Sequence, residues 1–221
     1  MLAEAGINLN LAPVVDLNAN PDNPIIGKIE RSFSADSNVV TNHAREVIKA
    51  HHKFSVLTTL KHFPGHSSSR DDSHWGFVDV TQSWTSAELE PYARIIAAGQ
   101  CDAVMTAHIF NANLDSSFPA TLSKPIITGI LREQLKFDGV VISDDMQMKA
   151  IADHYGFDEA IHRAIDAGVD IIAIANNSIF DENVAARAIA VIKQLVQDGK
   201  ISPARIEQSC QRIMRLKVRA G

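Results

Sequence analysis

Two adjacent carboxylates, Asp144 and Asp145, follow a short run of β-branched residues at 140–142. That run has no polar alternation, which is typical of a parallel strand buried on both faces. In α/β barrels and open α/β sheets, chemistry is placed at the carboxyl ends of such strands. We interpret Asp145 as the N-cap of a following helix, which leaves Asp144 as a candidate nucleophile or general base.

Asp72 and His74 form a second candidate pair, two residues apart on a polar loop. Residues at i and i+2 of an extended segment project to the same side, so the Asp72 carboxylate can accept a hydrogen bond from His74. Such a contact fixes the imidazole tautomer and raises its basicity. The spacing predicts that His74 donates and accepts protons near neutral pH.

Metal and nucleotide chemistry have weaker support. The four histidines that follow predicted strands invite a metal hypothesis; they are His62, His66, His74 and His108. No His-x-His pair occurs, and Pro64 and Gly65 separate the first two, so we expect no metal. No glycine-rich phosphate-binding motif is present either. We therefore predict chemistry without a metal or an organic cofactor.

Five apolar runs are predicted to be strands, and helical patterns alternate with them. The expected strands are 7–15, 55–60, 102–107, 140–142 and 169–175, and the expected helices are 39–54, 86–99, one from Ser123, 158–167, 182–197 and 202–219. Each strand ends in polar or ionisable side chains: Asp16, Lys61 with His62, His108, Asp144 and Asn176. Strand–helix alternation implies a parallel sheet with right-handed crossovers, which gathers these side chains at one edge.

The length of the chain favours an incomplete barrel. A complete eight-stranded barrel takes about 250 residues, whereas this chain has 221 and five predicted strands. It opens on what looks like the last turn of a helix, ended by Gly6. We predict an α/β fold, a TIM-type (β/α) barrel incomplete at its N-terminal end, in a single domain 1–221. A doubly wound open sheet is the alternative, and we expect further sequence upstream.

The net charge of the chain limits the classes of partner that we expect it to bind. A formal net charge of −5 without a basic patch argues against nucleic acid or an anionic membrane as a main partner. The longest apolar runs are too short to span a bilayer. Cys101 and Cys210 lie in no metal-type or redox-type spacing and are predicted to be reduced. We expect a monomer or a weak homodimer.

Several motifs together resemble glycoside hydrolase family 3, in its bacterial β-N-acetylhexosaminidase branch. They occur in the order of the family: Leu11–Asp16, Glu30–Phe33, Lys61–His66, Asp72–His74, Met105–His108, Pro119–Ser123 and Val141–Met146. Two features depart from it. An early strand ending in Asp-x-Glu-Gly-Gly has no counterpart, and Ser67 stands where the family usually has glycine. If the early strands are absent from the molecule, we expect no turnover.

The resemblance implies that Asp144 is the nucleophile of a retaining glycosidase and that His74, assisted by Asp72, is its acid/base. Three further positions match those that bind sugar hydroxyls: Arg31, Lys61 and His62. The implied substrate is a small carbohydrate with terminal β-linked N-acetylglucosamine, such as a peptidoglycan fragment. The alternatives are a β-glucosidase-like or phosphorolytic relative and a non-catalytic sugar-binding fragment. The compartment stays open between the bacterial cytoplasm, which we favour, and the periplasm, since any leader would lie upstream.

Overall fold

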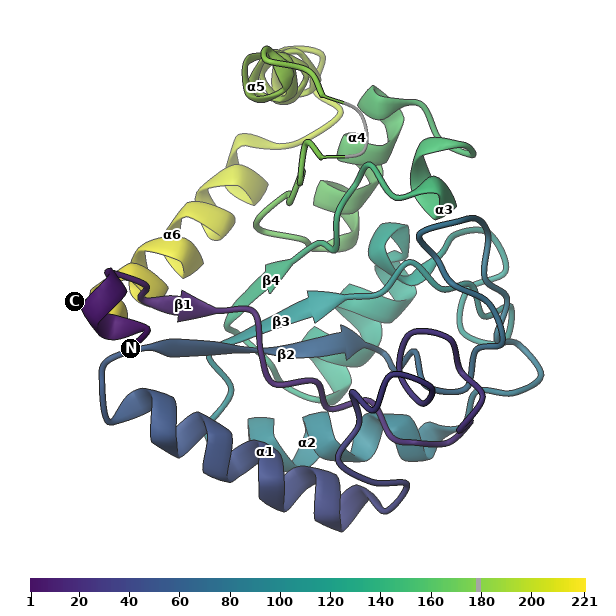
Figure 1. Ribbon diagram of the computed structural model, residues 1–221. Helices are drawn as coiled ribbons and strands as arrows, with labels where there is room; N and C mark the ends of the chain where they lie inside the picture. The colour runs from purple at the N-terminus through teal and green to yellow at the C-terminus, as the bar shows by residue number, and fades with distance from the viewer. Residues whose placement is uncertain (178–179) are drawn as a thin grey trace.

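The computed structural model describes residues 1–177 and 180–221 and contains one parallel sheet. Its strands are β1 (Leu9–Asn10), β2 (Leu57–Phe63), β3 (Ala103–Thr106) and β4 (Val140–Ile142). They lie side by side in the order of the sequence, and all three pairings are parallel (Figure 1). All four strands therefore present their carboxyl ends at the same edge.

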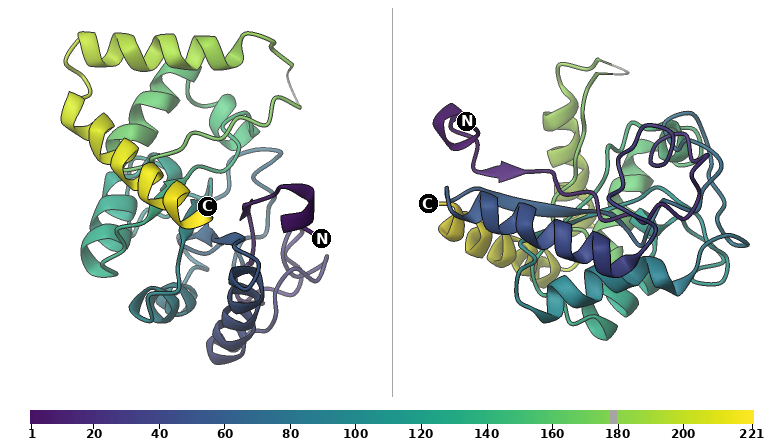
Figure 2. Two further views of the ribbon diagram at one scale, coloured as in Figure 1. Left: turned by 90° about the vertical axis from the view of Figure 1, so that its left-hand side faces the viewer. Right: turned by 60° about the horizontal axis from the view of Figure 1, so that its bottom comes forward.

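The strand order decides between the two predicted folds. A doubly wound sheet reverses its strand order at a switch point, whereas this sheet runs β1-β2-β3-β4 without reversal. Sequential parallel strands with helical crossovers are the arrangement of a (β/α) barrel. The predicted barrel type is confirmed, and the barrel is not closed in the described part of the chain (Figures 1 and 2).

The helices follow the strands as the patterns predict. They are α1 (Ser37–His52), α2 (Glu90–Ala97), α3 (Lys149–Ala152), α4 (Phe157–Ala167), α5 (Val184–Gln197) and α6 (Pro203–Ala220), with the short 3₁₀ helices η1 (Ala3–Ala5), η2 (Ser86–Leu89) and η3 (Ala120–Leu122) and the wider helix η4 (Pro125–Gln134). Ser202 caps α6 as predicted, because its side chain accepts from the Arg205 N–H. None of the described helices has the length and apolar character needed to cross a membrane.

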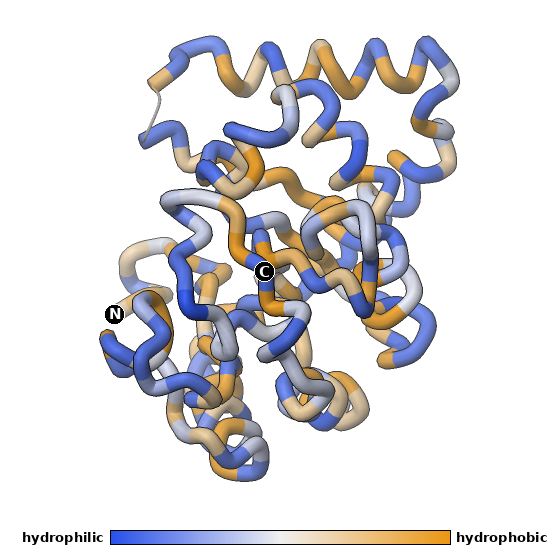
Figure 3. Tube along the Cα trace, turned by 90° about the vertical axis from the view of Figure 1, so that its right-hand side faces the viewer, coloured by the Kyte–Doolittle hydropathy of each residue, from blue (hydrophilic) through white to orange (hydrophobic). Residues whose placement is uncertain are grey.

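Strands β3 and β4 are buried on both faces, which is why their sequences show no polar alternation. Val141 belongs to the large core beneath α1 and α2, where Phe63 meets Tyr92 edge to face with ring centroids 5.2 Å apart. Val140 and Ile142 point to the opposite face and pack with Leu216 of α6. Along the outer helices, hydrophobic and hydrophilic residues alternate, most clearly along α5 (Figure 3). Helices therefore cover the sheet on both sides.

Helix α6 passes the amino edge of the sheet (Figure 2), and its arginines fasten it there. Three aspartates lie beside the amino ends of successive extended segments, and each contacts at least one of these arginines: Asp102 with Arg219, Asp138 with Arg212 and Arg215, and Asp170 with Arg205 and Arg212. Asp170 also binds Arg132 at 2.7 Å. Because these contacts lie at the amino edge, they stabilise the fold away from the candidate chemistry.

Two predicted strands differ from the structure. The expected strand 169–175 is reduced to a single bridge between Ile171 and Ile142, because the Ala173 N–H turns instead to the Ser143 hydroxyl, 2.8 Å away. The expected strand 7–15 is regular only at β1, with one further isolated bridge between Val14 and Lys61. In contrast, β2 extends to Phe63, so it contains Lys61 and His62 within the strand.

Candidate active site

Asp144 lies directly after β4, at the carboxyl edge of the sheet. One of its carboxylate oxygens accepts from the Asp145 N–H at 2.9 Å. Burial by itself raises the pKa of Asp144. Charge and hydrogen bonding outweigh burial and hold the pKa below its usual value; the groups responsible are His108, His62, the Asp145 N–H and His74. The carboxylate is therefore ionised at neutral pH, as a nucleophile requires.

Asp145 has a structural role, but it is not the helix cap that the sequence predicts. Its carboxylate accepts from the N–H of Gln147 at 3.1 Å and of Ala175 at 2.9 Å. Helix α3 begins only at Lys149, and no side chain caps it. The prediction is wrong because the local sequence looks the same in both cases: an aspartate that caps a helix, and one that accepts hydrogen bonds from its own turn and from a neighbouring segment. Asp144 is still the acid with fewer backbone contacts.

The structure brings Asp72 and His74 together as their spacing predicts. The Asp72 Oδ1 atom accepts from the His74 backbone N–H at 2.8 Å and lies 2.6 Å from the ring Nδ1. With Nδ1 carrying its proton toward Asp72, Nε2 is free to exchange protons with a ligand. The His74 side chain is 55% exposed, yet it is close enough for its charge to lower the pKa of Asp144. The pair is therefore open to solvent and interacts electrostatically with the Asp144 carboxylate.

The three residues expected to bind sugar hydroxyls also lie at this edge. Arg31 reaches from the loop before α1 and places Nη2 3.4 Å from the Nε2 atom of His62. Burial and the repulsion from Arg31 lower the pKa of Lys61, while Asp144 and Asp16 oppose that change. Lys61 therefore interacts electrostatically with both Arg31 and Asp144, so that one cationic donor is coupled to the candidate nucleophile.

Asp16 organises this group from below. It is fully buried and accepts from the His62 ring Nδ1 at 2.8 Å, the His62 N–H at 3.1 Å and the His66 N–H at 2.8 Å. Burial raises the pKa of Asp16, but the contacts with His62 and His66 together outweigh burial and lower it, so the carboxylate is charged. Nδ1 of His62 must then be the donor, which leaves Nε2 as an acceptor for Arg31. The sequence places Asp16 at a strand end, but does not indicate this role.

Replacing Asp16 by asparagine is expected to lower the free energy of unfolding by about 3 kcal/mol, because one buried donor loses its partner and the charge facing His62 disappears. Urea denaturation followed by circular dichroism measures this change. The exposed Asp22→Asn variant is the control and should stay within about 0.5 kcal/mol of the wild type. Equal stability of the two variants would contradict the assigned role.

His108 fixes the backbone that carries Asp144. Its Nε2 atom lies 2.9 Å from the Asp145 carbonyl oxygen and its Nδ1 atom lies 2.8 Å from the Thr121 hydroxyl. Burial lowers the pKa of His108. A carbonyl oxygen can only accept, so Nε2 carries a proton and donates it to the Asp145 carbonyl. The turn after β4 is therefore held from the end of β3.

Glu88 is a buried carboxyl on η2 that contacts the turn after β2. It is 1% exposed, and its Oε2 atom accepts from the Ser67 N–H at 3.1 Å and the Ser67 hydroxyl at 2.7 Å. A side chain at Gly65 would meet Glu88 at 2.6 Å, so the turn packs directly on the carboxyl. Burial raises the pKa of Glu88 from 4.5 to about 7. Glu88 therefore supports the segment that leads to Asp72 and His74.

The raised pKa of Glu88 predicts a pH-dependent stability. Between pH 4.5 and 7 the folded protein binds a proton that the unfolded chain releases, so stability from this group is full below pH 4.5 and lost as the pH rises through 7. At about 1.36 kcal/mol per pH unit, the wild type should lose about 3 kcal/mol relative to Glu88→Gln across this window. Urea denaturation of both proteins at pH 4.5, 6 and 8 measures the difference. Parallel pH curves would contradict the prediction.

Asn176, the last strand-end residue that the sequence points to, does not join the site. Its backbone N–H binds the Gln147 side chain at 2.8 Å, and its own amide binds the backbone of Asp181. It therefore shapes the turn that follows. Within residues 1–177 and 180–221, no three His, Cys, Asp or Glu side chains are grouped as a metal ion would require.

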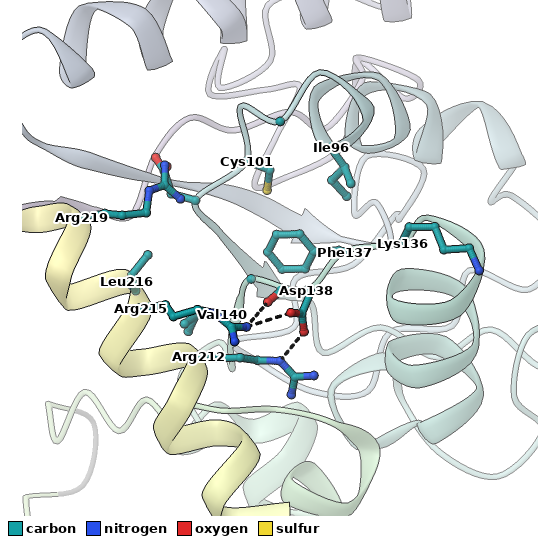
Figure 4. A pocket seen from close by; sticks show the side chains of 13 residues that line it. Ile96, Cys101, Lys136, Phe137, Asp138, Val140, Arg212, Arg215, Leu216 and Arg219 are labelled. Atoms are coloured by element: carbon teal, nitrogen blue, oxygen red, sulfur yellow. Dashed lines mark hydrogen bonds and ion pairs between the residues drawn. The ribbon is translucent and has the colours of Figure 1, made fainter.

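A hollow of about 300 Å³ lies at the opposite edge of the sheet (Figure 4). It is lined by the amino ends of β3 and β4 and by the arginines of α6, and Arg212 and Arg215 point to Asp138. Its arginines are already paired with carboxylates, so it is part of the anchorage of α6. The candidate chemistry belongs to the other edge, where the strands end.

Comparison with known proteins places this arrangement in context. The model of the glycosyl hydrolase family 3 N terminal domain matches residues 1–216. The β-hexosaminidase A of Pseudoalteromonas piscicida is 36% identical in an alignment 236 residues long, which covers 99% of this chain and 39% of that protein. The chain therefore spans about two fifths of the length of that relative.

Solved structures of similar proteins have the same fold as this chain. A family 3 β-N-acetylglucosaminidase from Paenibacillus sp. superposes with a TM-score of 0.91 at 37% identity, covering 99% of this chain and 41% of that chain. A β-N-acetylhexosaminidase from Beutenbergia cavernae superposes with a TM-score of 0.90 at 31% identity, covering 98% of this chain and 64% of that chain.

Proposed function

Because the chain belongs to glycosyl hydrolase family 3, we propose that it is a retaining glycoside hydrolase that removes terminal β-linked N-acetylglucosamine. The observation that carries the proposal is the placement of an ionised Asp144 within electrostatic reach of a His74 ring that Asp72 orients. We also propose that residues 1–221 act as one catalytic domain. The names of the similar proteins support this substrate class.

In the first step, the Asp144 carboxylate attacks the anomeric carbon of the sugar. The bond to the leaving oxygen breaks, and the protonated His74 ring gives its Nε2 proton to that oxygen. A covalent glycosyl ester on Asp144 and a neutral imidazole result. The low pKa of Asp144 favours this step, because the nucleophile stays charged in mildly acidic solution.

In the second step, water attacks the same carbon and the neutral His74 ring takes a proton from it. The ester bond to Asp144 breaks, which returns the carboxylate and the imidazolium. The Asp72 carboxylate, 2.6 Å from the ring Nδ1, stabilises the imidazolium between turnovers. Two inversions at the anomeric carbon give net retention.

The sugar is held at the same edge of the sheet. Arg31 and Lys61 supply charged donors, and His62, whose ring Asp16 fixes, supplies a rigid polar edge. We propose a fragment of peptidoglycan as the natural aglycone, and comparing hydrolysis of a peptidoglycan fragment with that of chitobiose tests this choice. A markedly slower reaction with the peptidoglycan fragment would favour chitin-derived substrates instead.

Incubating the full chain with 4-nitrophenyl N-acetyl-β-D-glucosaminide tests the function, with release of nitrophenol as the readout. Proton NMR of the first product should show the β-anomer, because the reaction retains configuration. An α-anomer as the first product would overturn the mechanism. Binding of N-acetylglucosamine without turnover would instead support the sugar-binding alternative.

A further inference from the structure

The loop that carries Asp72 and His74 is attached through the residue between them. Ser73 is 1% exposed, whereas the His74 side chain beside it is 55% exposed. The Ser73 hydroxyl lies 3.0 Å from the Nε2 atom of His66. The two functional side chains therefore extend from a loop whose central residue points inward.

His66 is itself held on two sides. Its ring Nδ1 lies 3.0 Å from the Ser69 hydroxyl, and its backbone N–H donates to Asp16 at 2.8 Å. Burial lowers the pKa of His66 to about 4, so the ring is neutral across the physiological range. A neutral imidazole has one donor and one acceptor, and a hydroxyl can serve either. The two serines therefore satisfy both ring nitrogens.

The outer side of the loop rests on α3. The Ala150 N–H donates to the Ser73 carbonyl oxygen at 3.3 Å, and the Lys149 ammonium lies 5.6 Å from the centre of the Trp75 ring. The Lys149–Trp75 contact is exposed and the backbone bond is long, so both are weak. The hydrogen bond to His66 is the buried contact of this set.

We propose that His66 and Ser73 are positioning residues, and that the hydrogen bond between them holds the Asp72–His74 loop where the His74 ring serves the reaction at Asp144. This inference rests on the proposed function. It assigns no contact with substrate to either residue. Their effect passes through the position of His74.

Removing the hydroxyl by Ser73→Ala should lower kcat about tenfold, because a buried Nε2 atom loses its partner and the undocked loop becomes more populated. KM should change less than threefold, since Arg31, Lys61 and His62 are untouched. The control is Ser209→Ala, which removes another buried hydroxyl, one that donates to Asp170 at the opposite edge of the sheet. Its kcat and KM should stay near wild type.

Azide separates positioning from a general loss of structure. The leaving group of a dinitrophenyl glycoside needs no acid. With this substrate, the step that still needs His74 as a base is the attack of water on the glycosyl ester. Azide attacks without a base, so it should accelerate Ser73→Ala and yield the glycosyl azide. Wild type and Ser209→Ala should show no acceleration. An equal response of all three proteins to azide would overturn the proposal.

Hydrogen exchange monitored by mass spectrometry gives a readout that needs no activity. Ser73→Ala should lose protection in peptides covering 70–77 and 149–152, because the Trp75 and Ala150 N–H groups bond within or to this loop. Ser209→Ala should not lose protection there. If the wild type hydrolyses nothing, the proposed function fails, and exchange alone decides whether the hydrogen bond holds the loop. Unchanged protection in Ser73→Ala overturns the inference in either case.

Discussion

Replacing Asp144 by asparagine is expected to reduce hydrolysis of 4-nitrophenyl N-acetyl-β-D-glucosaminide by at least about 10⁴-fold, because an amide cannot form the glycosyl ester. Asparagine has nearly the same shape and still accepts from the Asp145 N–H, so the fold should persist. Initial rates at saturating substrate, together with circular dichroism spectra, check both expectations. The exposed Asp153→Asn variant should keep wild-type rates.

The covalent ester distinguishes this mechanism from one in which the acetamido group of the substrate acts as the nucleophile. A slow substrate such as a 5-fluoro glycosyl fluoride should leave the sugar attached to the wild-type chain. Peptide mass spectrometry should then locate it on Asp144. Turnover of Asp144→Asn near the wild-type rate, or no labelled peptide from an active wild type, would remove Asp144 from the mechanism.

Replacing His74 by alanine is expected to lower kcat about 10²–10⁴-fold with an aglycone that needs protonation, the usual contribution of a general acid/base. With a dinitrophenyl aglycone the loss should be smaller, because that leaving group departs without a proton. Stopped assays over a series of leaving groups measure the trend. A rate that falls steeply with the leaving-group pKa in His74→Ala, but not in the wild type, assigns the acid role.

Azide tests the base role of the same residue. It should restore turnover of the dinitrophenyl glycoside by His74→Ala and produce the β-glycosyl azide. The control is His162→Ala on α4, a histidine whose ring Nδ1 lies 3.6 Å from the Glu159 carboxylate on the same helix. An equal loss of activity in both variants would mean that His74 acts only on stability. Phosphate in place of azide tests the phosphorolytic alternative. If the protein is a phosphorolytic enzyme, phosphate should accelerate turnover by the wild type as well as by His74→Ala.

Residue patterns alone determined much of the fold of this protein. The buried strand at 140–142 appears as an unbroken apolar run because both of its faces are covered, and the expected strands 55–60 and 102–107 overlap β2 and β3. The start of α6 at Ser202 and Pro203 was predictable because a capping hydroxyl acts within one helical turn. Local spacing also predicted the Asp72–His74 contact. Each of these features depends on residues only a few positions apart.

Tertiary structure decided the support beneath the candidate site. Asp16 reaches His62 across 46 positions, and His108 reaches the Asp145 carbonyl across 37. Glu88 meets Ser67 across 21. No local periodicity encodes which strand ends become neighbours, so the sequence indicates that Asp16 and His108 lie at the correct edge without revealing their partners.

The fifth predicted strand failed for the same physical reason. The run 169–175 has the composition of a buried strand, but it forms a single bridge to β4, at Ile171, and the Ala173 N–H bonds to the Ser143 side chain. An apolar run indicates that a segment is buried. Whether its backbone joins the hydrogen-bond ladder of the sheet depends on the polar groups that the neighbouring turn presents. Burial was thus readable from the sequence, whereas hydrogen-bond partners were set by the packed chain.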